Sequence, residues 1–197
     1  IQGLTIPDDS YQMTTTQAVL SVKLPAPIDR YLIVAPINEA MSLWEELKDS
    51  HTPCSHHIWQ WLDIQAGIPS IVSETREEFV PQMVNLELID AVNFKKGCYP
   101  GQEIVARMHY LGKAKRRMFK LYSHDAIPPA PGTDLYLNDG DGQSAGTIVL
   151  AEPAKSEGTD MLAVIRLSHE NSDQLRIGSA DGPVVEFTDL PYSLTPD

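Results

Sequence analysis

"FVPQMVNLELIDAVNFKKGCYPGQEIVARMHYLGKAKRRMF", residues 79–119, joins two differently patterned parts of the chain. Near its centre, Cys98 lies between a pair of lysines, Lys95 and Lys96, and a proline–glycine turn. Pro100 suits the first turn of a helix, where its missing N–H costs nothing, so we expect a helix to begin there. A helix N-terminus and neighbouring lysines both stabilise a thiolate, which favours an activated thiol at Cys98.

Two alternatives for Cys98 stay open from the residues alone. Its thiol is reactive, or it is a small buried hydrophobe with an inert sulfur. Gly97 and Gly101, on either side, indicate a backbone that bends tightly or lies against a ligand. The second cysteine, Cys54, belongs to "HTPCSHH" (51–57), whose residue types bind zinc but whose spacing matches no common zinc site. We expect a surface loop there and no metal.

Positive charge gathers around the same region. The chain has a net charge of −12, yet residues 95–120 hold eight of its 15 basic residues against one acid, Glu103. This window carries +7, which leaves −19 for the rest. We call its basic residues the basic band: Lys95, Lys96, Arg107, Lys113, Lys115, Arg116, Arg117 and Lys120. The band either contacts an anionic partner or is a solvated face that pairs with acids elsewhere in the fold.

Upstream of residue 79 the pattern alternates between short strands and helices. Residues 17–24 alternate like a half-buried strand, and residues 31–36 are typical of a buried strand. Asn38 can cap a helix over 39–48. The apolar stripe of that helix would consist of Met41, Leu43, Trp44 and Leu47. Residues 68–94 show no clear period, and we expect irregular structure there.

A second helix is predicted over "HHIWQWLDIQA" (56–66), with Ser55 as its cap and Gly67 at its end. Its packed face would consist of Ile58, Trp61, Leu62 and Gln65. Trp59 lies about 100° around the helix from Ile58 and therefore points elsewhere. A tryptophan in that position is a candidate to stack on a flat heteroaromatic ligand.

After Lys120 the chain consists of short strand-like runs separated by turn signals. The runs are "FKLYSHD", "DLYLND", "SAGTIVLAEP", "MLAVIRLS", "QLRIGS" and "VVEFTDL". Such spacing is typical of a small all-β sandwich or barrel. The predicted fold class is therefore α+β, with one domain over residues 1–117 and a C-terminal antiparallel β-barrel over residues 118–197.

Composition limits the classes of function. The chain has 197 residues, 42% of them hydrophobic, which is enough for a core. No apolar run approaches the roughly 20 residues that cross a bilayer, so we expect no membrane partner.

We expect a cytoplasmic location. The opening "IQGLTIPDDS" does not have the pattern of a signal peptide, and two cysteines fit a reduced setting. Because no initiator methionine is present, we expect a fragment. We expect neither a nucleophilic serine nor a paired-carboxylate site.

The run Lys96–Glu103 has the pattern K-G-C-Y-x-G-Q-E. This pattern resembles the signature of the YgfZ family of folate-binding proteins, relatives of the glycine-cleavage T-protein, an aminomethyltransferase. The upstream "FVPQMVNLE" (79–87) is similar to the family's F-[IV]-P-Q-x-x-N-L element, and the closing "LPYSL" (190–194) also matches. The resemblance runs from about Tyr31 to the C-terminus and lacks the family's front section.

The resemblance implies a T-protein-like core that binds tetrahydrofolate or a derivative. It also implies support of iron–sulfur cluster assembly or repair, including in enzymes that modify tRNA. Cys98 would be the key residue, assisted by Lys96. Iron–sulfur enzymes or assembly proteins would be the clients, and tRNA or another anion would meet the basic band. The residues implied at the folate site are Trp59, Gln65, Tyr99, Gly101, Gln102, Glu103 and Arg107.

One departure from the family concerns the element I-E-A-G-x-P, which is "IQAGIP" (64–69) here. The family's glutamate is Gln65 in this chain. A carboxylate accepts hydrogen bonds from two adjacent pterin N–H donors, whereas an amide offers one acceptor and its own donors. We expect weaker pterin binding, or a different ligand.

Two other functions remain open. A folate-dependent aminomethyltransferase would need a well-placed acid for proton transfer. The catalytic aspartate of the T-protein, to which the family is related, lies in the front section, which we expect to be missing from this chain. A binding module without chemistry would carry a Cys98 of ordinary thiol reactivity.

Overall fold

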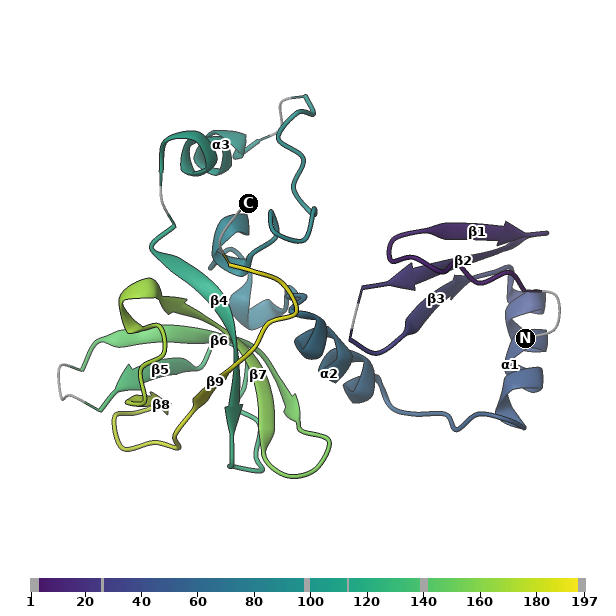
Figure 1. Ribbon diagram of the computed structural model, residues 1–197. Helices are drawn as coiled ribbons and strands as arrows, with labels where there is room; N and C mark the ends of the chain where they lie inside the picture. Colours follow the sequence, from purple (N-terminus) through teal and green to yellow (C-terminus); the bar gives the residue numbers. More distant parts are fainter. Residues whose placement is uncertain (1–3, 26, 98–99, 113, 139–141, 195–197) are drawn as a thin grey trace. The chain divides into compact units, whose positions relative to one another are not determined.

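The computed structural model describes residues 4–25, 27–97, 100–112, 114–138 and 142–194 (Figure 1). The chain falls into two compact units, residues 1–62 and residues 63–197. Residues 63–117 group with the C-terminal tail in the second unit, so the sequence boundary near 117 stays a proposal. Among the described residues, no helix is long and apolar enough to cross a bilayer.

The first unit combines a small sheet with a helix. Its elements are β1 (Met13–Thr16), β2 (Val19–Leu24), β3 (Arg30–Val34) and α1 (Ile37–Lys48). The strands form an antiparallel sheet in the order β1-β2-β3. The predicted strands at 17–24 and 31–36 correspond to β2 and β3. The prediction that the second of them is buried is wrong, because Leu32 and Val34 of β3 are 45% and 51% exposed.

Helix α1 differs from its prediction at its start and in its packing. It begins at Ile37 with Pro36 at the N-cap and no side-chain cap, so the predicted Asn38 cap is wrong. The Pro36 carbonyl already accepts the first helical bond, from Ala40 N–H at 2.9 Å. No residue of α1 is buried, and the predicted stripe members Met41 and Trp44 are exposed.

Helix α2 (His56–Ala66) begins in the first unit and ends in the second. Its predicted packed face is wrong at Ile58, which is 48% exposed, whereas Ile64 is fully buried. The buried residues of α2 are Ile64 and Ala66, both in its last turn, and Ile64 belongs to a core cluster of the second unit. Gly67 ends the helix as predicted, with a φ of 65° that suits glycine. A Cβ there would lie 2.6 Å from the Tyr192 ring.

The second unit contains irregular connections and a six-stranded sheet. Before the sheet come η1 (Ser73–Thr75), η2 (Pro81–Val84) and α3 (Gln102–Leu111). The remaining elements are β4 (Arg116–Ser123), β5 (Asp134–Leu137), β6 (Ser144–Pro153), β7 (Thr159–Arg166), η3 (Leu167–His169), β8 (Leu175–Ile177) and β9 (Glu186–Thr188). All six predicted runs contain a strand. Helix α3 begins two residues after Pro100, because Gly101 at its N-cap has a left-handed φ of 82°.

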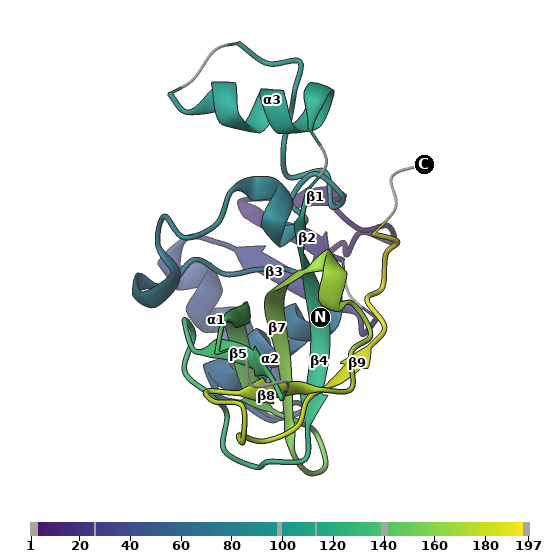
Figure 2. The same ribbon diagram turned by 90° about the vertical axis from the view of Figure 1, so that its left-hand side faces the viewer.

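The sheet has the antiparallel order β8-β5-β6-β7-β4-β9, and one stretch of chain links its two edges (Figure 2). Ile177 N–H of β8 donates to the Pro183 carbonyl at 3.0 Å, and Val185 N–H donates to the Leu175 carbonyl at 3.2 Å. The chain then continues as β9, which pairs with β4. The sheet thus curls and closes on itself, which confirms the predicted α+β class with a small antiparallel barrel.

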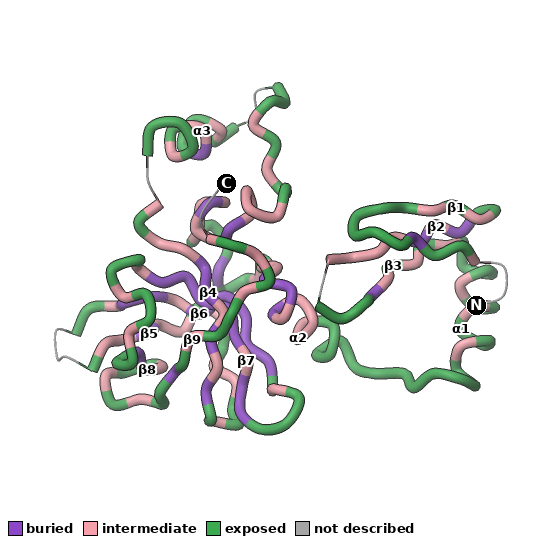
Figure 3. The backbone as a smooth tube through the Cα atoms, viewed as in Figure 1, coloured by how far each residue is buried: buried purple, intermediate pink, exposed green. Residues whose placement is uncertain are grey.

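Two apolar cores hold this unit together. The first includes Phe119, Leu121 and Ile165, and the second includes Met118 and Val164. Successive residues of a strand point to opposite faces, so β4 contributes to both cores. Buried positions concentrate along β4, β6 and β7 (Figure 3). Ile64 of α2 and Val84 of η2 complete the second core.

Candidate functional site

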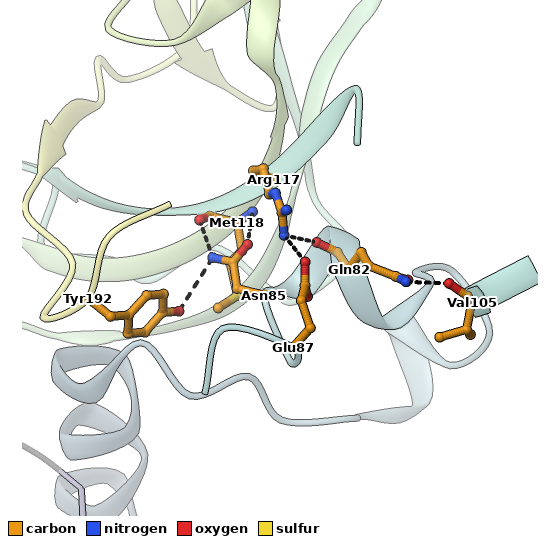
Figure 4. A network of polar contacts seen from close by, with 7 residues as sticks. All are labelled: Gln82, Asn85, Glu87, Val105, Arg117, Met118 and Tyr192. Atoms are coloured by element: carbon orange, nitrogen blue, oxygen red, sulfur yellow. Dashed lines mark hydrogen bonds and ion pairs between the residues drawn. The ribbon is translucent and has the colours of Figure 1, made fainter. Parts of the chain in front are cut away.

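Asn85 is the centre of a polar network in the second unit (Figure 4). It ends η2 with a left-handed φ of 60° and is fully buried. Its Nδ2 donates to the Met118 carbonyl at 2.7 Å, and Met118 N–H donates to its Oδ1 at 3.4 Å. Strand β9 pairs with β4 only from Lys120 to Tyr122. The Asn85 amide therefore takes the place of a neighbouring strand at Met118.

Gln82 connects this network to α3. Its Nε2 donates to the Val105 carbonyl in α3 at 2.7 Å. The backbone carbonyl of Gln82 accepts a hydrogen bond from Arg117 Nη1 at 2.8 Å. The same Nη1 forms an ion pair with Glu87. The side chains of Arg117 and Glu87 are only 12% and 10% exposed. Two further acceptors, Gln82 Oε1 and Glu87 Oε2, are buried without a hydrogen-bond partner in the described part of the chain.

Tyr192 joins two more segments to the network. Its hydroxyl donates to the Gly67 carbonyl at 2.7 Å and accepts from Asn85 Nδ2 at 3.4 Å. The network therefore brings together "IQAGIP", "FVPQMVNLE", α3, β4 and "LPYSL". The sequence singled out these segments as elements of a resemblance, without indicating that Gln82, Asn85 or Tyr192 would connect them.

A cavity of about 850 Å³ lies beside the network. Its lining includes Gln82, Glu87, Arg117, Phe94 and His109. The rings of Phe94 and His109 stack with centroids 3.7 Å apart and planes 12° apart. This stack ties the segment just before the signature loop to α3.

The predicted site residues of the signature fall into three groups. Cys98 and Tyr99 lie outside the described residues. Lys96 and Gly101 are exposed on either side of them. Helix α3 carries the rest: Gln102 is half-buried, and Glu103 and Arg107 are exposed.

The two predicted residues of α2 have separate surroundings. Trp59 belongs to the first unit, where the Arg30 guanidinium carbon lies 5.0 Å from its ring centroid. Such a distance allows a cation–π contact. Gln65 belongs to the second unit, where its Nε2 donates to Asp160 Oδ2 of β7 at 3.0 Å. A carboxylate thus lies next to the amide that replaces the family's glutamate.

The basic band does not form one continuous surface. Arg117 is paired with Glu87, as the alternative of internal pairing expects. Arg116 precedes it on β4, so the two side chains start from opposite faces of the strand. Lys113 lies outside the described residues.

Residues 142–146, "GQSAG", form a G-x-S-x-G pattern that the sequence reasoning overlooked. A nucleophilic serine with this pattern lies on a sharp turn from a strand into a helix. Ser144 is instead the first residue of strand β6. Its Oγ lies 3.0 Å from Asp134 Oδ1 and 2.9 Å from the Gly146 carbonyl oxygen. Its setting is that of a residue that organises a strand end.

Known proteins resemble this chain in sequence. It is 35% identical over 172 residues to a tRNA-modifying protein YgfZ of Yersinia enterocolitica. The aligned residues make up 87% of this chain and 52% of that relative. It is 30% identical over 191 residues to a protein of the same name in Pectobacterium carotovorum, and this alignment covers 96% of this chain and 57% of that relative. The chain thus spans little more than half the length of these relatives. No family model matches it.

Its fold also has a relative of known structure. The glycine cleavage system aminomethyltransferase T of Bartonella henselae superposes with a TM-score of 0.68 at 17% identity. The superposition covers 89% of this chain and 50% of that protein. The chain is therefore similar to YgfZ proteins over the part that it spans, and its fold is similar to that of about half of the glycine-cleavage T-protein.

Proposed function

We propose that this chain is part of a tetrahydrofolate-binding protein of the cytoplasm that supports tRNA modification. It would do so by assisting the assembly or repair of iron–sulfur clusters in the modifying enzymes. The name of its relatives, tRNA-modifying protein YgfZ, supports the link to tRNA modification. The T-protein fold supports a folate ligand.

The observation that carries the proposal is the anchoring of residues on both sides of Cys98. On the upstream side, the Phe94 ring stacks on His109, and Lys95 N–H donates to Asn93 Oδ1 at 2.8 Å. On the downstream side, Gln82 holds the Val105 carbonyl of α3. These contacts connect the described segments on either side of the signature to each other and to η2. The proposal gives Cys98 thiol chemistry or transient contact with a cluster or substrate, assisted by Lys96.

Asp160 of the second unit offers a carboxylate that could bind a pterin. A pterin presents adjacent N–H donors that match a carboxylate. Asp160 accepts a hydrogen bond from Gln65, and a carboxylate can accept from more than one donor. Asp160 would therefore supply the charge that the family's glutamate carries, with Gln65 orienting it. Trp59, Tyr99, Gly101, Gln102, Glu103 and Arg107 stay the residues that the resemblance implies for folate binding.

Cys98→Ser tests the thiol, with Cys54→Ser as the matched control because Cys54 is an exposed thiol outside the signature. In cells that depend on this protein, we expect Cys98→Ser to lower the activity of iron–sulfur enzymes that modify tRNA. The control should leave that activity at its original level. Equal activity in both variants would refute the role of Cys98.

Alkylation kinetics test the site directly. In a Cys54→Ser background, we expect Cys98 to react with an apparent pKa below the usual value of about 8.5. Tetrahydrofolate should slow the reaction. An ordinary pKa without protection would favour a binding module. Formation of methylene-tetrahydrofolate by the protein would favour the aminomethyltransferase.

A further inference from the structure

Two arginines face each other across the end of the barrel's central ladder. Arg116 is the first residue of β4, and Arg166 is the last residue of β7. They are directly opposite in the antiparallel register. Opposed residues of such a pair have Cβ atoms about 5 Å apart on one face of the sheet. Both guanidinium groups can therefore reach a common point.

In the described part of the chain, this pair of arginines has no ion-pair partner. Two residues along each strand, on the same face, the opposed pair Met118 and Val164 is buried in the second core. The arginines are half-buried at the rim of that apolar layer. Like charges directly opposite each other destabilise a sheet, so the arrangement needs an explanation.

We infer that Arg116 and Arg166 form a binding site for a phosphate group. The planar fork of a guanidinium group matches two phosphate oxygens, and two such forks can neutralise a dianion. A bound phosphate would convert the repulsion between the arginines into attraction. The strands hold both residues rigidly, because Leu167 N–H donates to the Lys115 carbonyl at 2.9 Å just beyond the pair.

The phosphate can come from a small phosphate ester or from the backbone of RNA. Arginine suits both, because it recognises the oxygens rather than what they are attached to. This inference goes beyond the proposed folate function and does not depend on it. Loss of folate binding would leave the phosphate site intact, and loss of the phosphate site would leave Cys98 reactivity intact.

Thermal unfolding in phosphate and in chloride at equal ionic strength is the first test. Phosphate stabilises proteins in general, so the variants decide the result. We expect Arg116→Gln and Arg166→Gln to lose most of the extra stabilisation that phosphate gives the original chain. Lys120→Gln, a change of one charge on the same face of β4, should keep it. In dilute chloride, each arginine variant should melt at a higher temperature than the original, because the repulsion is removed.

Binding of a short single-stranded RNA, followed by fluorescence anisotropy, separates the two sources. Weaker RNA binding by about tenfold in each arginine variant, with Lys120→Gln close to the original, would assign the site to RNA phosphates. Loss of the phosphate effect with no RNA binding in any protein would assign it to a small phosphate ester. If phosphate stabilises the arginine variants as much as the original chain, the inference is wrong.

Discussion

The side-chain amide of Asn85 forms the hydrogen bonds that a neighbouring strand would otherwise form with Met118, and the backbone of Asn85 adopts an unfavourable conformation. The side chain satisfies both polar groups of Met118, while the φ of 60° is unfavourable for a residue with a Cβ. Asn85 therefore contributes through its hydrogen bonds and tolerates its conformation better than most residues do. These two effects can be measured separately.

Asn85→Ala is expected to lower the free energy of unfolding by about 3 kcal/mol, because buried groups of Met118 lose their partner. Asn85→Gly removes the same amide but accepts a positive φ without strain. It should therefore be more stable than the alanine variant by about 1 kcal/mol. Urea unfolding of both variants checks this. Equal stability of the two would show that backbone strain at Asn85 is negligible.

The hydrogen bond between Gln65 and Asp160 can be tested by exchanging the amide and the carboxylate. Gln65→Glu would put two carboxylates within hydrogen-bonding distance and raise the pKa of one of them. A carboxyl with a raised folded-state pKa stabilises the fold when protonated. The variant should be less stable than the original by about 1 kcal/mol near neutral pH, and the difference should shrink as the pH falls.

The double variant Gln65→Glu with Asp160→Asn restores one carboxylate and one amide. It should recover the stability that Gln65→Glu loses, as measured by urea unfolding across pH. Under the proposed function it should also bind tetrahydrofolate better than Asp160→Asn alone. Recovered stability without recovered binding would confirm the contact and contradict the pterin role.

At the level of elements, α3 is held by few contacts with the rest of its unit. Val105 is its one buried residue, and the Val105 carbonyl receives the Gln82 amide. Gln82→Ala should therefore speed amide hydrogen exchange in α3 by roughly tenfold, the equivalent of one lost hydrogen bond. The amides of β7 should exchange as before and provide the internal control. Equal changes in α3 and β7 would show that Gln82 supports the whole unit.

The strands were easier to predict than the helix faces. The runs after Lys120 alternate between two apolar layers or pack on both sides, so their periodicity and turns mark them clearly. The face of α2 was wrong at Ile58, because only the last turn of that helix meets a core. Periodicity gives the apolar side of a helix but not how much of its length has a partner.

The candidate site was predictable only in part. The signature around Cys98 is local, and a sequence shows it directly. The ion pair between Arg117 and Glu87 joins residues 30 positions apart, so the sequence left open whether Arg117 pairs within the fold or contacts a partner. The opposition of Arg116 and Arg166 depends on strand register, which the sequence alone does not specify.

Across the whole molecule, buried apolar side chains are unevenly shared between the two units. In residues 4–62, leaving out residue 26, Pro7 and Val19 are the only apolar side chains that are buried. The second unit contains both core clusters, with side chains such as Met118, Leu121 and Ile148 fully buried. Buried apolar area provides most of the stabilisation of a fold, so the first unit should be much less stable than the second.

The three tryptophans allow this difference to be measured, because Trp44, Trp59 and Trp61 all belong to the first unit. Tryptophan fluorescence should therefore change at a lower urea concentration than the loss of slow amide exchange in β6 and β7. A two-state chain would give one midpoint for both probes. Separate midpoints would show that residues 1–62 unfold while the barrel remains folded. A single midpoint would mean that the two units unfold together, and that residues 1–62 are not an independent weak point.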